Sequence, residues 1–217
     1  MEIHLVVELS AHGARVAHPV ARNFRVSAAI IHAVMRRFDP PILIIIFMFS
    51  FFSKVTAGSN GTAYDYEFNS IDGEIIKLSQ YRGKVIVVVN VASRCGYTPQ
   101  YKDLQSLWST YKNDVVVIGV PTNNFKQEPK DNAEIKKFCE TNFGVNFPMT
   151  EKMDVIGNNA HPFYKWAKKN HGIGAIPKWN FHKIVIGKNG KVIDTFASFT
   201  KPNSSKFLDV INKGIKS

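Results

Sequence analysis

Two short runs of apolar, β-branched residues, 84–92 and 115–120, constrain the fold of this chain most. Neither run alternates with polar residues, and such continuity is typical of strands that are buried on both faces of a sheet. Each run is followed by apolar residues at helical spacing, which predicts a helix after each strand. The order strand, helix, strand, helix indicates an α/β layer fold in which the first two strands pair in parallel.

The second half of the chain predicts an antiparallel addition to this sheet. Residues 181–186 and 191–196 have strand composition, and the Gly-Lys-Asn-Gly sequence at 187–190 is typical of a hairpin turn. We expect further helices over 161–169 and 204–216. The predicted architecture is therefore a central mixed sheet flanked by helices.

Capping signals predict where the first two helices begin and end. Thr98 and Pro99 are expected to be the N-cap and first helical residue of the first helix. Asp131 with Glu134 predicts a capping box at the start of the second helix, and Gly144 predicts its end.

The first quarter of the chain predicts an export signal rather than part of the fold. An apolar run of about 11 residues, 42–52, follows Arg36 and Arg37 and precedes small residues that end at Ala57. As a helix this run reaches about 16 Å, short of the ~30 Å hydrocarbon core of a membrane. We therefore expect residues 35–57 to be a signal peptide that directs the protein to a secreted, periplasmic or lumenal destination. The alternative is an uncleaved membrane anchor formed by the same apolar run.

Residues 1–34 have no pattern to which a fold or function can be assigned. Because a signal peptide normally starts at the N-terminus, we expect Met35 to be the true start and the upstream extension to be a start-site artefact. Residues 58–217 then form a single domain of ordinary size.

Composition limits the classes of function. With 45% hydrophobic residues in 217, the chain can bury a core, and its two cysteines exclude a cysteine-dense disulfide scaffold. The formal net charge of +11 is typical of proteins that bind nucleic acid or an anionic surface. Lysine pairs such as those at 136–137 and 168–169 indicate solvated helix faces instead. We therefore expect no nucleic-acid partner, and membrane-surface association stays open. No metal or cofactor is expected, because ligand spacing and glycine-rich phosphate loops are absent from the sequence.

Cys95 lies where a thiolate is stabilised. It follows the first buried strand and precedes the predicted N-cap Thr98 by three residues, so backbone amides and the helix dipole favour an anion there. Arg94 adjoins it, and Gly96 allows close approach by a substrate. Because the thiolate is the reactive form of cysteine, these features favour a reactive thiol over a half-buried structural one.

The second thiol, Cys139, lies inside the second predicted helix beside Phe138. Its distance from Cys95 in the sequence excludes the Cys-x-x-Cys dithiol of ordinary thioredoxins. Periodicity alone leaves two interpretations open, a core helix residue or one half of a static disulfide with Cys95.

Three ordered segments resemble the glutathione peroxidase family, in its cysteine-containing, thioredoxin-dependent branch of the phospholipid-hydroperoxide type. They are NVASRCGYT at 90–98, VPTNNFKQEP at 120–129 and KWNF at 178–181. The resemblance covers about residues 64–213. It implies a thioredoxin-like fold and an oxidoreductase that reduces peroxides with electrons from a thiol.

The resemblance also implies site residues. Cys95 matches the peroxidatic position, and Trp179 and Asn180 match the tryptophan and asparagine of the family's catalytic tetrad. The tetrad glutamine is not found, because the family pattern Asn-Gln-Phe is Asn-Asn-Phe at 123–125. Asn124 is therefore the expected fourth member, with a side chain one methylene shorter. It could make the same hydrogen bond only if the loop moved inward or a water bridged, and Gln127, from a separate part of the pattern, is the other carboxamide within reach.

The implied reaction has three steps. The Cys95 thiolate attacks hydrogen peroxide or an organic or lipid hydroperoxide and becomes a sulfenic acid. Cys139 matches the resolving cysteine of two-cysteine members and forms a disulfide with it. Because a disulfide needs Cα atoms within about 7 Å, we expect the helix around 132–143 to unwind. A thioredoxin-like dithiol protein is the expected reductant, with glutathione as the alternative. The short stretch between Trp166 and Lys178 implies a monomer.

Two other functions stay open. A redox sensor or relay would pass the Cys95 disulfide to client proteins with little peroxidase turnover, and the missing tetrad glutamine favours this modestly. A basic surface-binding domain would instead keep a structural bond between Cys95 and Cys139.

Overall fold

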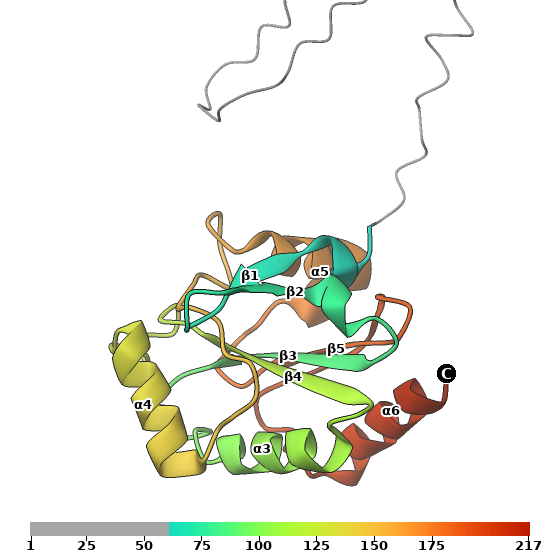
Figure 1. Ribbon diagram of the computed structural model, residues 1–217. Helices are drawn as coiled ribbons and strands as arrows, with labels where there is room; N and C mark the ends of the chain where they lie inside the picture. Colours follow the sequence, from blue (N-terminus) through green and yellow to red (C-terminus); the bar gives the residue numbers. More distant parts are fainter. Residues whose placement is uncertain (1–60) are drawn as a thin grey trace, which may run out of the picture. The chain divides into compact units, whose positions relative to one another are not determined.

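The computed structural model describes residues 61–217, so the predictions for 1–34 and 35–57 lie outside the described residues. Its central sheet has the strand order β4-β3-β5-β6 (Figure 1). The strands are β3 (Val85–Val91), β4 (Val115–Pro121), β5 (Lys183–Ile186) and β6 (Val192–Phe196). Strands β3 and β4 are parallel, whereas β5 pairs antiparallel with both β3 and β6. The predicted mixed sheet, with its early parallel and late antiparallel pairs, is confirmed.

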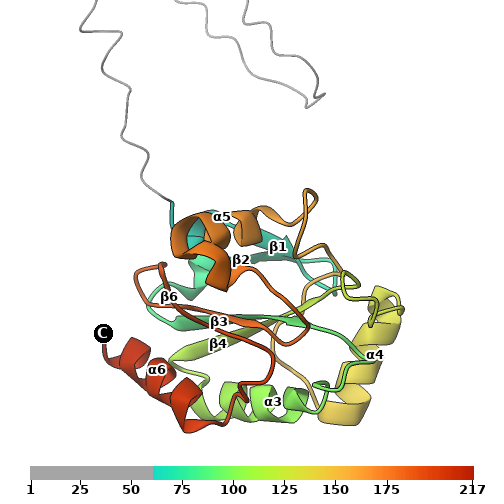
Figure 2. The same cartoon turned by 180° about the vertical axis from the view of Figure 1, so that it is seen from behind.

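Helices cover both faces of this sheet (Figures 1 and 2). They are α3 (Gln100–Tyr111), α4 (Asn132–Phe143), α5 (Pro162–His171) and α6 (Ser205–Lys216). Three short 3-10 helices, η1 (Ala63–Asp65), η2 (Leu78–Tyr81) and η3 (Gly172–Ala175), accompany them. This arrangement is the expected thioredoxin-like fold.

The described domain has two hydrophobic clusters. Strand β3 contributes to both, because its side chains alternate between the two faces of the sheet. Val87 and Val89 belong to the hydrophobic cluster formed with α3, α4 and α6. Ile86 and Val88 belong to a second cluster, which α5 and the segments before β3 complete. All seven residues of β3 are buried, which explains why the strand is apolar at every position except Asn90.

A two-stranded antiparallel sheet, which the sequence reading did not predict, lies on the α5 side. Strands β1 (Glu67–Asn69) and β2 (Ile75–Lys77) pair so that Phe68 faces Ile76. Only the middle residue of each strand is buried. Phe68 then stacks on the His161 ring at the start of α5, with 4.5 Å between ring centroids.

One helix start differs from the prediction and another agrees with it. Helix α3 has Pro99 at its N-cap, so Thr98 is not the cap that we expected, and its hydroxyl is used elsewhere. Helix α4 begins with the predicted capping box of Asp131 and Glu134 and ends at Gly144 in the left-handed conformation. Among residues 61–217, no helix has the length and apolar character needed to cross a membrane.

Candidate active site

The Cys95 loop connects the carboxyl end of β3 to α3. Thr98 organises it, because its hydroxyl donates to the Ala92 carbonyl (2.9 Å) and accepts from the Cys95 N–H (3.1 Å). These bonds replace the helix cap that we expected, since the chain makes an extra turn before α3 begins. The Tyr97 N–H points back at the Cys95 Sγ at 3.4 Å. A backbone donor aimed at sulfur stabilises a thiolate.

The segment after β4 fastens this loop from the other side. The buried Glu128 carboxylate accepts from both the N–H and the hydroxyl of Ser93, each at 2.7 Å. The Gln127 carbonyl accepts from the Arg94 N–H at 3.0 Å. Burial raises the pKa of Glu128, while the two Ser93 bonds act in the opposite direction. Glu128 was not singled out from the sequence, although its position in the VPTNNFKQEP segment marks it as part of the site.

Trp179 and Asn180 lie in the segment before β5, which is hydrogen-bonded to the end of β3. Asn90, at the end of β3, donates from Nδ2 to the Trp179 carbonyl (3.1 Å), and its own carbonyl accepts from the Phe181 N–H. Asn180 is completely buried and donates from Nδ2 to the Gln127 Oε1 at 2.9 Å. Phe181 is in the left-handed region at φ 63°, which makes a sharp turn directly after Asn180.

Trp179 is 41% exposed. Its ring lies 5.5 Å from the Phe125 ring, centroid to centroid. Trp179 is thus partly open to solvent, whereas the carboxamide of Asn180 is enclosed. Three predicted residues, Cys95, Trp179 and Asn180, lie on segments that are linked by hydrogen bonds through Asn90 and Gln127.

The Asn124 side chain is occupied by another loop. Its Nδ2 donates to the Asp154 carboxylate at 2.6 Å, and its Oδ1 accepts from the Val155 N–H at 2.7 Å. The same oxygen also accepts from the Ile156 N–H and the Thr122 hydroxyl. No hydrogen bond within residues 61–217 joins Asn124 to Cys95, and its tetrad role stays a prediction.

Cys139 is nearly fully buried in α4, and both cysteines are free thiols. Burial raises the pKa of Cys139 to about 11, an effect that the neighbouring Tyr101 hydroxyl partly offsets. The thiol therefore keeps its proton at neutral pH. Cys139 also lines a surface pocket of about 490 Å³ that extends between α4 and the β1–β2 turn.

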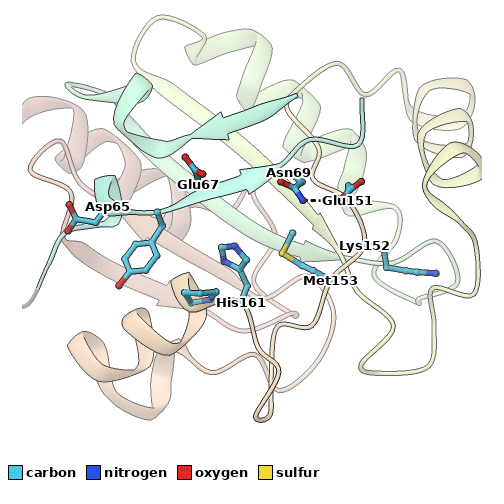
Figure 3. Close-up of a pocket in the computed structure, with 9 residues that line it drawn as sticks. Asp65, Glu67, Asn69, Glu151, Lys152, Met153 and His161 are labelled. Carbon is cyan, nitrogen blue, oxygen red and sulfur yellow. Dashed lines mark hydrogen bonds between the residues drawn. The ribbon is translucent and has the colours of Figure 1, made fainter. Parts of the chain in front are cut away.

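A larger surface pocket, of about 570 Å³, lies away from the cysteines (Figure 3). It is bounded by β1, residues 151–153 and the start of α5, with the Asn69 amide donating to Glu151 across one end. It contains none of the predicted site residues. No group of three or more histidine, cysteine or acidic side chains within the described residues could hold a metal ion.

Comparisons with known proteins agree with this geometry. Residues 63–168 match the family model described as glutathione peroxidase. The hydroperoxy fatty acid reductase gpx1 of Synechocystis sp. is 42% identical over 159 residues, which cover 69% of this chain and 94% of that protein. The glutathione peroxidase-like peroxiredoxin 2 of Saccharomyces cerevisiae is 46% identical over 147 residues, covering 65% and 90% of the two chains. The crystal structure of Trgpx in apo form has a TM-score of 0.59 and 40% identity, and the match covers 73% of this chain and 98% of that one. The chain belongs to the glutathione peroxidase family.

Proposed function

We propose that Cys95 is the peroxidatic residue of this chain, a thiol-dependent peroxidase that reduces hydroperoxides. One observation carries the proposal: the Cys95 Sγ accepts from the Tyr97 N–H in a loop that is hydrogen-bonded to Gln127, which also accepts from Asn180. A sulfur that accepts from a backbone N–H is suited to react as a thiolate.

In the first step, the Cys95 sulfur attacks one oxygen of the peroxide. An S–O bond forms while the O–O bond breaks, so the peroxide gains two electrons and Cys95 becomes a sulfenic acid. The departing oxygen takes a proton and leaves as water or an alcohol. The Trp179 indole N–H and the Asn180 amide supply donors for the charge that develops, and the exposure of Trp179 leaves a path for the peroxide.

In the second step, Cys139 attacks the sulfenic sulfur, forming a disulfide and releasing the oxygen as water. Cys139 is buried, and its raised pKa keeps it protonated while α4 is folded. Opening of α4 would both bring this thiol to Cys95 and return its pKa toward the ordinary value. The resolving reaction is therefore coupled to local unfolding of α4.

In the third step, a thiol reductant returns both cysteines to the reduced state by disulfide exchange. We propose a thioredoxin-like dithiol protein, with glutathione as the alternative. The match to a peroxiredoxin supports a protein dithiol, and the match to a hydroperoxy fatty acid reductase supports lipid hydroperoxides among the substrates, beside hydrogen peroxide. The basic charge would attract the chain to anionic membrane surfaces where such lipids occur.

A steady-state assay with thioredoxin, its reductase and a nicotinamide readout tests the proposal. Cys95→Ser should abolish turnover, and Cys139→Ser should lower it at least tenfold while leaving the first oxidation of Cys95 intact. Glutathione in place of thioredoxin should support a lower rate. Turnover that survives Cys95→Ser would show that the reaction lies elsewhere, and oxidation without turnover would favour the relay.

A further inference from the structure

We propose that Gln127 is a positioning residue of the peroxidase reaction, which fixes the Asn180 carboxamide beside the Cys95 loop. The inference rests on the proposed function and adds a residue to the same site. It is carried by the hydrogen bonds of Gln127, by the engagement of Asn124 elsewhere, and by the turn that brings Gln127 inward.

The first observation is the bond between the two carboxamides. Asn180 donates from Nδ2 to the Gln127 Oε1 at 2.9 Å, and the Asn180 side chain has no exposed surface. The Asn180 Oδ1 has no hydrogen-bond partner among the described residues. Within residues 61–217, Gln127 is thus the one group that fixes the orientation of this buried amide.

The second observation is that Gln127 holds the Cys95 loop at the same time. Its carbonyl accepts from the Arg94 N–H at 3.0 Å, one residue before Cys95. The next residue, Glu128, accepts twice from Ser93. One short segment therefore sets the position of Asn180 relative to the reacting sulfur, by side chain on one side and by main chain on the other.

The third observation concerns Asn124, the residue aligned with the tetrad glutamine. Its amide already bonds to Asp154, Val155 and Ile156, which ties the loop after β4 to the segment before α5. Turning Asn124 toward Cys95 would leave these partners without their bonds, at a cost for each buried group. Within residues 61–217, the Gln127 side chain has no hydrogen bond other than the one with Asn180.

The backbone explains how a residue from a different part of the pattern reaches the site. Lys126 has a φ of 57°, and its N–H donates to the Asn123 carbonyl at 2.9 Å, so the chain reverses just before Gln127. The amide of Asn180 has two N–H groups, and Gln127 accepts one of them. The second can then donate to the sulfur or to the departing oxygen, where a fixed donor stabilises developing charge.

The test is the second-order rate of Cys95 oxidation by hydrogen peroxide, measured on the full chain by stopped-flow tryptophan fluorescence. Gln127→Ala should lower this rate by about 10- to 100-fold, and Asn180→Ala by a similar factor. Because the two residues act as one unit, the double variant should be no more than about threefold slower than the slower single variant. Gln127→Met keeps the length of the side chain without its acceptor and carries the same expectation.

Gln105→Ala is the matched control, because Gln105 is also a half-buried glutamine bonded to an asparagine, Asn146, away from Cys95. Its rate should stay within about twofold of the wild type. Rates of Gln127→Ala and Gln127→Met equal to this control, or fully multiplicative losses in the double variant, would overturn the inference. If the wild-type Cys95 does not react with peroxide at all, the proposed function itself fails, which is a different result.

Discussion

Lys183 is fully buried at the start of β5 although it carries an ammonium group. Its Nζ donates to the Gln100 Oε1 at 2.5 Å and to the Thr200 carbonyl at 2.7 Å, both neutral acceptors. Burial lowers its pKa from 10.5 to about 7, and the charge of Asp103 opposes this only in part. Lys183 ties α3 to the loop after β6, at the expense of desolvating a charge.

This burial predicts how stability depends on pH. Between pH 7 and 10.5 the unfolded chain holds a proton on Lys183 that the folded chain has released, so stability should rise with pH across this window. Below pH 7 both states are charged and the burial penalty is complete. Lys183→Met should therefore reduce the slope of unfolding free energy against pH by up to about 1.4 kcal/mol per pH unit.

Urea unfolding between pH 7 and 8 measures that slope. Cys139 is present in wild type and variant alike, so its own titration, from an ordinary pKa of 9.0 to about 11 in the folded chain, cancels in the comparison. Lys102→Met, at an exposed lysine of α3, is the control and should leave the slope unchanged. An equal slope in wild type and Lys183→Met would contradict the prediction.

Some features of the site residues could be predicted from the sequence and others could not. The place of Cys95 between β3 and α3 could be predicted, because a strand, a glycine and a helix start surround it in the sequence. The hydrogen bond between Gln127 and Asn180 could not be predicted, because it follows a reversal at Lys126, whose positive φ no propensity indicates. The prediction of Thr98 as the N-cap of α3 was wrong, because its hydroxyl bonds within the Cys95 loop instead.

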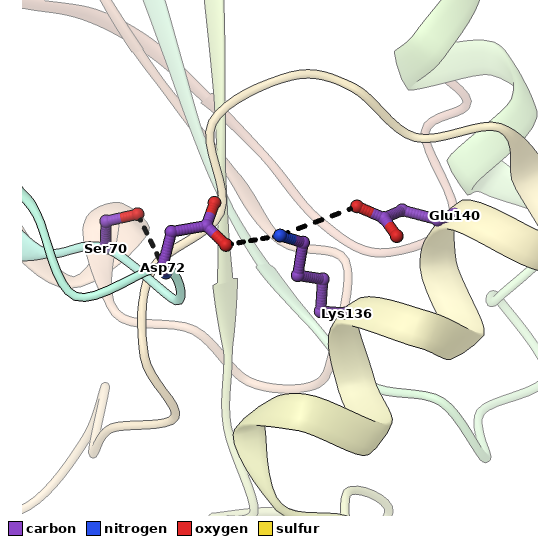
Figure 4. Close-up of polar contacts among 4 residues, drawn as sticks. All are labelled: Ser70, Asp72, Lys136 and Glu140. Carbon is purple, nitrogen blue, oxygen red and sulfur yellow. Dashed lines mark hydrogen bonds and ion pairs between the residues drawn. The ribbon is translucent and has the colours of Figure 1, made fainter.

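At the scale of elements, an ion pair fastens α4 to the β1–β2 turn (Figure 4). Lys136 contacts the Asp72 carboxylate at 2.5 Å and Glu140 at 3.8 Å. The Asp72 N–H also donates to the Ser70 hydroxyl, which orders the turn that presents the carboxylate. Lys136 lies one helical turn before Cys139, so any opening of α4 that releases Cys139 must separate Lys136 from Asp72.

Asp72→Asn should therefore accelerate disulfide formation after Cys95 is oxidised. The pair is exposed to solvent, so we expect a modest gain of about two- to fivefold in the resolving step and no change in the first oxidation. Thiol titration after rapid quenching, with one equivalent of peroxide, follows both steps. Glu140→Gln removes the longer contact and should have a smaller effect, and added salt should bring the wild-type rate toward that of Asp72→Asn. A slower resolving step in Asp72→Asn would show that the pair aids the reaction instead.

Strands β3 and β4 could be predicted from the sequence, whereas β1 and β2 could not. Strands β3 and β4 are buried on both faces, and a strand in that environment is apolar at nearly every position. Strands β1 and β2 have three residues each and only one buried side chain apiece. Such short strands carry too little alternation to be distinguished from a loop, and their pairing depends on the tertiary contact of Phe68 with His161.

At the scale of the whole molecule, two hydrophobic clusters form the core of the described domain. Among residues 61–217 the first buried members are Ala63 in one cluster and Val85 in the other, and β3 is the wall that both share. The Trp166 indole N–H donates to the Gly61 carbonyl at 2.7 Å, so the start of the domain is tied to α5. A chain that begins at Gly58 retains all of these described contacts.

We propose, from the signal-like sequence at 35–57, that the protein is exported, cleaved after Ala57 and functions as residues 58–217. Produced alone, this segment should unfold in one transition with the midpoint of the full chain, and its Cys95 should react with peroxide at the same rate, within about twofold. A chain that begins at Ala63 loses the Gly61 carbonyl, leaves the Trp166 N–H without this partner, and should melt lower. N-terminal sequencing of the protein from its native source should start at Gly58. A native peptide from residues 1–34, or a 58–217 chain that does not fold, would show that the upstream segment belongs to the working molecule.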